Sequence, residues 1–257
     1  MRGNPFLEEG MRIYFSHRGI LRTCLFIPCG LAVVLLVVWP RGSLESILRT
    51  GPFINAFSVI ALAFLALLLY LGLRYGSEDF SPDTLVQLRE FVTMTPVSLL
   101  SVVLGKAGFF TLHTLFLLLL GAPFLLAPMA VGGVTLPKAF AAFAILGTAS
   151  LAARMFGLLV LALVGTRRLW RDIILLTGVL IYAVTVLVAV PSLSPIRALL
   201  GLSSVPGAGG HPPASLLSPA AACSLLHGAA ALICAAATLL VLQSSRRRAR
   251  GGRRADG

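Results

Sequence analysis

PFINAFSVIALAFLALLLYLGL, residues 52–73, is the stretch that decides the fold class of this chain. It has no charged residue, and its apolar residues fill every face of a helix instead of alternating as they do in a barrel strand. About 20 such residues in a helix cross the roughly 30 Å of hydrocarbon in a bilayer. A helix also satisfies its own backbone hydrogen bonds in lipid. The stretch therefore predicts a transmembrane helix.

Five more apolar runs share this character, and the composition agrees with them. Of the 257 residues, 58% are hydrophobic and only 12% are charged, whereas soluble domains carry about 25% charged residues. We expect an all-α integral membrane protein with six transmembrane helices in one membrane domain. The predicted spans are 23–39, 52–73, 107–130, 139–164, 173–190 and 219–242.

The positive charges predict the orientation of these spans. With the N-terminus inside, cytoplasmic segments hold 16 of the 21 Lys and Arg residues and the outer loops hold four. This asymmetry places both chain ends in the cytoplasm. The net charge of +12 suits anionic lipid headgroups better than nucleic acid, because most basic residues flank apolar runs. We expect a multi-pass protein of the cell's inner (cytoplasmic) membrane, with lipids and not nucleic acid as partners.

Both ends of the chain differ in composition from the spans. Residues 1–22 predict an amphipathic elbow helix on the inner leaflet, with Asn4 as its cap and Pro5 at its first position. The alternative for this segment is a frayed basic tail. Residues 23–243 form the predicted six-helix domain. Residues 244–257 are rich in arginine, and we expect a disordered basic tail there.

The longest predicted cytoplasmic connection, residues 74–106, contains a short helix signal. Ser81-Pro82-Asp83 is a favourable helix start, Leu85, Leu88 and Val92 recur at helical spacing, and Pro96 ends the pattern. Such a helix could dock a cytoplasmic partner or could simply connect two spans. Both interpretations remain open on this evidence.

The sequence lacks the motifs of nucleotide hydrolysis, ion coupling and metal binding. Gly105-Lys106 lacks the upstream glycine and the following Ser or Thr of a phosphate-binding loop. We therefore expect no ATP hydrolysis by this chain alone and no enzymatic activity. All nine acidic residues lie outside the predicted spans, which disfavours ion-coupled carriers. The four cysteines lie in apolar runs without a CxxC pair, so neither a metal site nor a bound cofactor is expected.

Two titratable residues within the spans are candidates for a substrate pathway. Arg154 lies near the middle of the fourth run, where a charge is expensive, and His113 lies in the third. Arg154 could contact an anionic or polar substrate group, or it could bond to backbone and hydroxyl groups at a helix interface. For His113 the alternative is a packing role.

The predicted cytoplasmic connection, residues 74–106, resembles the corresponding loop in the permease subunits of ABC transporters of the type-2 export family. The similarity covers Glu78 to Ser98, including Thr95-Pro96-Val97-Ser98, and continues to Leu104-Gly105-Lys106. The resemblance implies a dimer of identical or similar permeases above two cytoplasmic ATPases, which hold ATP and Mg²⁺. It makes residues 84–95 a coupling helix and residues 195–202 part of an extracellular gate. The implied ATPase contacts are Asp83, Thr84, Leu85, Gln87, Leu88, Glu90, Phe91, Thr95 and Pro96.

Two alternatives stand beside this expectation. A permease similar to the haem exporters of cytochrome assembly has a comparable six-span layout. A membrane scaffold or anchor without a transport role would also fit the spans. The chain departs from the family pattern at Ser81-Pro82-Asp83, where many members carry a glycine, and at the midspan Arg154.

Overall fold

The computed structural model describes residues 4–16, 18–39, 52–77, 88, 92–93, 96–132, 135–164, 168–184, 194–203 and 217–255. These residues form eight helices and no strand. The helices are α1 (Pro5–Ser16), α2 (Arg18–Val38), α4 (Pro52–Ser77), α6 (Leu99–Gly132), α7 (Leu136–Val164), α8 (Arg168–Val184), α9 (Pro195–Ser203) and α10 (Leu217–Ala255).

The expectation of an all-α, multi-pass membrane protein is confirmed. Within the part of the chain that the structure describes, four helices are long and apolar enough to cross a bilayer, namely α4, α6, α7 and α10, and α2 contributes a shorter apolar stretch, Cys24–Val38. The predicted fifth span, 173–190, is described only as far as the end of α8 at Val184. Helix α6 runs without a break through Pro123 and Pro128, since neighbouring helices allow proline inside membrane helices.

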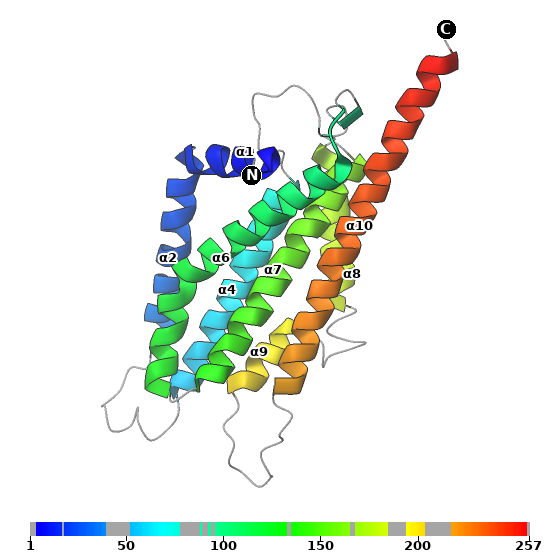
Figure 1. Ribbon diagram of the computed structural model, residues 1–257. Coiled ribbons are helices and arrows are strands. Elements are labelled where there is room, and N and C mark those ends of the chain that lie inside the picture. Colours follow the sequence, from blue (N-terminus) through cyan, green and yellow to red (C-terminus); the bar gives the residue numbers. More distant parts are fainter. Residues whose placement is uncertain are drawn as a thin grey trace.

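The helices form one bundle, which Figure 1 shows from the side. Helix α1 lies across one end of the bundle, which we call the α1 end, and α2 turns down from it. Helix α9 lies at the opposite end, which we call the α9 end. The C-terminal part of α10 also lies at the α1 end and projects beyond the other helices.

Asn4 fixes the start of α1 and ties it to α6. Its Oδ1 accepts a hydrogen bond from the Phe6 N–H at 3.0 Å, which is the expected cap, and its Nδ2 donates to the Ser101 carbonyl at 2.8 Å. A Cβ on Gly105 would lie 2.6 Å from Cβ of Phe6. Gly105, part of the Leu-Gly-Lys motif, therefore lets α1 sit directly on α6.

Helices α4 and α7 approach each other more closely than side chains would permit. A Cβ on Gly157 would lie 2.9 Å from backbone atoms of Leu73, Gly76 and Ser77. A Cβ on Gly76 would collide with the backbone of Arg154, and one on Gly72 would lie 3.1 Å from the Ser150 carbonyl oxygen. Gly72 and Gly76 are four residues apart, the spacing that lets membrane helices pack backbone to backbone.

The apolar core divides into two clusters along the bundle. The α9-end cluster joins α2, α4, α6, α7, α9 and the start of α10 around Phe57, Phe64 and Leu117. The α1-end cluster joins α6, α7 and α10 around Phe110 and Leu158, and α1 packs against it. Contacts with α4 and α7 bury Ala198 and Leu199 of α9, so this short helix belongs to the core.

The C-terminal segment differs from its prediction. Residues 244–255 continue α10 as helix instead of forming a disordered tail. Arginine is a strong helix former, and extending an existing helix is far easier than nucleating a new one. The Arg246 side chain also anchors this part, because its Nη1 donates to the Val97 carbonyl at 3.0 Å. The high arginine content of residues 244–255 therefore did not indicate disorder in this segment.

The glycine contact gives a stability prediction. Gly76→Ala should lower the free energy of unfolding by about 1–3 kcal/mol, because the added methyl must push α4 away from the α7 backbone. The matched control is Gly228→Ala in α10, whose added methyl meets no atom within 4 Å. Unfolding curves in mild detergent with increasing denaturing detergent would compare the two. Equal midpoints for both variants would contradict the close contact.

Candidate functional site

Only part of the predicted coupling segment can be placed. Of its predicted ATPase contacts, Leu88 and Pro96 are described; Asp83, Thr84, Leu85, Gln87, Glu90, Phe91 and Thr95 lie outside the described residues. Leu88 is helical, and together with Val92 it is buried in the α1-end cluster. Pro96 is exposed just before α6. Leu88 therefore packs within its own chain, while Pro96 lies at the surface.

Two arginines hold the ends of this loop. Where the loop leaves α4, Arg171 of α8 donates from Nη1 to the Ser77 carbonyl at 3.2 Å. Where the loop enters α6, Arg246 of α10 donates to the Val97 carbonyl at 3.0 Å. The Ser77 carbonyl lies at the C-terminus of α4, where carbonyls lack intrahelical partners and a cation is favourable. The loop is thereby connected to four helices: α4, α6, α8 and α10.

These two anchors were not predicted from the sequence. From the sequence both arginines indicate orientation only, because a positive charge beside a span has no specified partner until the helices are packed. The glycine contact of α4 and α7 was also missed. For that contact a signal was present: the four-residue spacing of Gly72 and Gly76.

The two candidate pathway residues are in direct contact. Arg154 of α7 donates from Nη1 to Nδ1 of His113 on α6 at 2.8 Å. An arginine N–H can only donate, so Nδ1 of His113 accepts and its ring proton is on Nε2. Arg154 is fully buried and His113 is 2% exposed. The sequence identified both residues but gave no reason to pair them.

Aromatic rings surround this pair. The rings of Tyr75 and Phe109 lie 5.2 Å and 5.7 Å from the His113 ring. The Arg154 guanidinium carbon lies 6.0 Å from the centre of the Phe110 ring, at the limit of a cation–π contact. The buried hydroxyls of Thr114 and Ser150 have no hydrogen-bond partner in the part of the chain that the structure describes.

The pair forms a polar layer between the two apolar clusters. Along α6, His113 separates Phe110 of the α1-end cluster from Leu117 of the α9-end cluster. Along α7, Arg154 separates Ala149 of the α9-end cluster from Met155 of the α1-end cluster. In this arrangement the two side chains link α6 to α7, which favours the helix-interface interpretation of Arg154. Its role in a pathway stays a prediction.

Metal binding finds no support among the residues described. No three His, Cys, Asp or Glu side chains are grouped there as metal ligands, and all four cysteines are free thiols.

Comparison with known proteins finds no matching family model, no matching curated protein and no matching solved structure. The resemblance of the loop therefore depends on its own residues.

The buried pair predicts an energetic coupling that can be measured. His113→Leu leaves the buried Arg154 guanidinium without its acceptor, and Arg154→Met leaves His113 without its donor. The double variant should therefore lose less free energy of unfolding than the two single variants lose in sum. The expected coupling is about 1 kcal/mol, since interhelical hydrogen bonds in membranes contribute about that much. Unfolding in mixed detergent micelles measures it.

The control for this cycle is Thr111→Val, which alters an exposed α6 residue that bonds only to its own helix at Ala107. Its loss should add to that of Arg154→Met without coupling. Additive losses for His113→Leu and Arg154→Met would show that the pair is not an interacting unit.

Proposed function

We propose that this chain is the permease subunit of an ATP-driven ABC exporter. Six spans with both ends in the cytoplasm would form half of a substrate pathway, completed by a second copy or a similar subunit. Separate cytoplasmic ATPases would bind at the α1 end and supply the energy. The observation that carries the proposal is the anchoring of the loop between α4 and α6.

The anchored loop suits the transmission of force. A cytoplasmic ATPase can move membrane helices only through a stiff contact at the inner face. Here the two ends of the loop bond to Arg171 and Arg246, and Leu88 and Val92 are buried against α6, α7 and α10. Displacement of this segment would therefore be passed at once to α4, α6, α8 and α10, and through the α1-end cluster to α7. A simple connecting loop needs no such attachments.

The arrangement of the ends also supports the proposal. Helix α1 and the C-terminal part of α10 lie at the same end of the bundle (Figure 1), as an even number of crossings requires. Most arginines of the C-terminal segment lie there too, which supports a cytoplasmic α1 end. Helix α1 would be the elbow on the inner leaflet. Helix α9, at the other end, would contribute to the outer gate.

The proposal predicts a specific loss of ATPase binding. A coupling helix that buries Leu88 and Val92 on one face would place Gln87 and Glu90 on another face, where a partner could contact them. Gln87→Arg with Glu90→Arg should weaken retention of the ATPase at least about tenfold, because like-charge or mismatched pairs at an interface cost several kcal/mol. The measurement is co-purification in detergent with any ABC ATPase that a neighbouring reading frame encodes.

The matched control adds positive charge at the same end of the bundle without touching the loop. Gln243→Arg with Ser244→Arg alters two exposed residues of α10, and the ATPase should remain bound. If no ATPase co-purifies with the unaltered chain, the scaffold alternative replaces the proposal. If the loop variant retains the ATPase as well as the control, the loop is not the contact.

The anchors themselves can be tested in the same complex. Arg246→Ala should leave the ATPase bound but reduce ATP-dependent protection of α10 from hydrogen exchange, since the bond to the Val97 carbonyl is lost. The control is Arg247→Ala, which removes an equal charge from an exposed neighbour. The same exchange pattern in both variants would remove Arg246 from the transmission path.

A further inference from the structure

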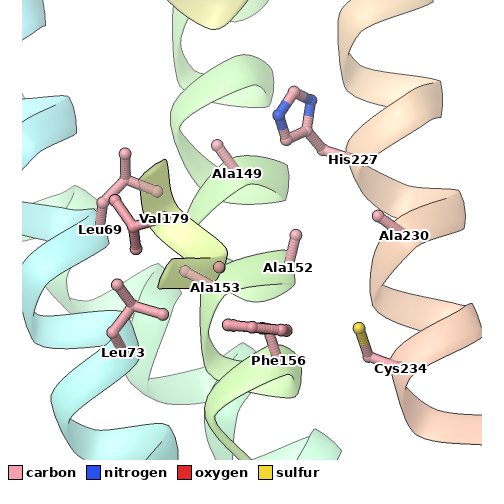
Figure 2. A pocket seen from close by; sticks show the side chains of 11 residues that line it. Leu69, Leu73, Ala149, Ala152, Ala153, Phe156, Val179, His227, Ala230 and Cys234 are labelled. Atoms are coloured by element: carbon pink, nitrogen blue, oxygen red, sulfur yellow. The ribbon is translucent and has the colours of Figure 1, made fainter. Parts of the chain in front are cut away.

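A cavity of about 280 Å³ lies among α4, α7, α8 and α10. Figure 2 shows its walls: Leu69 and Leu73 from α4, Ala152 and Phe156 from α7, and Ala230 from α10. It lies on a different side of α7 from the buried Arg154–His113 pair, and no residue implied to contact the ATPase lines it.

Small residues create this space. Helix α7 presents Ala149, Ala152 and Ala153, α8 presents Gly178, and α10 presents Ala230. The Phe156 ring supports α8 at one side, because a Cβ on Gly178 would lie 2.5 Å from it. Packed membrane helices normally fill the volume between them, so a void of this size beside several alanines leaves room for an apolar ligand.

The lining determines the chemistry of that occupant. Among the described residues that line the cavity, none is charged, and the only polar side chains are those of His227 and Cys234. Nδ1 of His227 donates to the Cys223 carbonyl of its own helix at 2.7 Å, which directs that nitrogen to the backbone. A lipid headgroup would lose its hydration here without ionic partners. Water is also a poor occupant, because apolar cavities stay dry.

The surroundings supply a suitable ligand. Leu176 and Leu180 on α8, and Leu232 and Ile233 on α10, are 63–73% exposed in the chain. These side chains face the hydrocarbon of a bilayer or another apolar surface. In its described residues, helix α8 packs mainly on α7 and is not packed closely against α4 or α10. The side between α8 and α10, where these leucines and Ile233 are exposed, can therefore admit an apolar chain from the bilayer.

We propose that this cavity is a binding site for one hydrocarbon chain, acyl or isoprenoid, of a membrane amphiphile. The chain enters between α8 and α10 and lies against Phe156, while its polar head stays outside the cavity. An apolar cavity of about 150 Å³ already binds benzene, so this larger one accepts several methylene groups. The site requires no ATPase and does not depend on the proposed export role.

The test is photo-crosslinking of the full-length chain in lipid vesicles. The probe is palmityl alcohol with a mid-chain diazirine and a terminal alkyne, and peptide mass spectrometry locates the adducts. We expect a saturable adduct on the peptides that hold Phe156, Val179 and Ala230–Cys234, and competition by unlabelled palmityl alcohol. Adducts that spread over all lipid-facing residues without saturation would overturn the proposal, because they indicate ordinary boundary lipid.

Filling the cavity gives the decisive comparison. Ala230→Phe should reduce the saturable adduct by about tenfold, because the phenyl ring takes the place of several methylenes. The control, Ala236→Phe, makes the same change at an exposed position of α10 and should label as the unaltered chain does. Equal labelling of the two variants would refute the site.

A second pair of variants protects the test against misfolding. Ala152→Phe fills the cavity from α7, and Ala144→Phe places the same ring at an exposed position of that helix. Each variant is used only after it elutes as a single species on size exclusion. Cross-links that join two copies of the chain through the cavity would identify a second copy as the occupant and overturn the lipid assignment.

Discussion

The close contact of α4 with α7 is the constraint on which the rest of the bundle depends. Gly76 and Gly157 bring the two backbones together where any side chain would separate them. The contact places Ser77, the end of α4, within reach of Arg171. It also brings Tyr75 of α4 against His113, the residue that accepts the hydrogen bond from Arg154 of α7. The Arg171 anchor at the end of α4 and the packing of Tyr75 on the polar layer thus depend on one backbone-to-backbone approach.

Much of this architecture could be predicted from the sequence. The apolar runs gave the helical class, and Asn4-Pro5 gave the start of α1, because both depend on local chemistry and on lipid as solvent. The pairing of Arg154 with His113 could not be predicted, since the residues are 41 positions apart and only the packing of α6 on α7 brings them together. The helical structure of the arginine-rich end of α10 was not predicted, because charge composition alone does not show that a helix precedes this segment and can continue into it.

Polar groups in this bundle act as connections between helices. Arg154 links α7 to α6, Arg171 links α8 to the end of α4, and Arg246 links α10 to the start of α6. Each guanidinium bridges elements that apolar contacts alone would leave free to slide in lipid, where no hydrophobic force drives helices together. Such a set of links makes the α1 end a unit that could move as one body, while the small-residue cavity beside α7 leaves α8 less constrained.

The central proposal is that ATP binding to separate ATPase subunits moves the α1 end of this chain relative to that of a partner permease. The most direct measurement is pulsed electron–electron double resonance in the complex of the chain with an ATPase. The spin labels are attached at position 98, where Ser98 is exposed just before α6. The account predicts a dipolar signal between two copies whose distance distribution shifts when ATP is added and trapped. An unchanged distribution in a complex that hydrolyses ATP would contradict it.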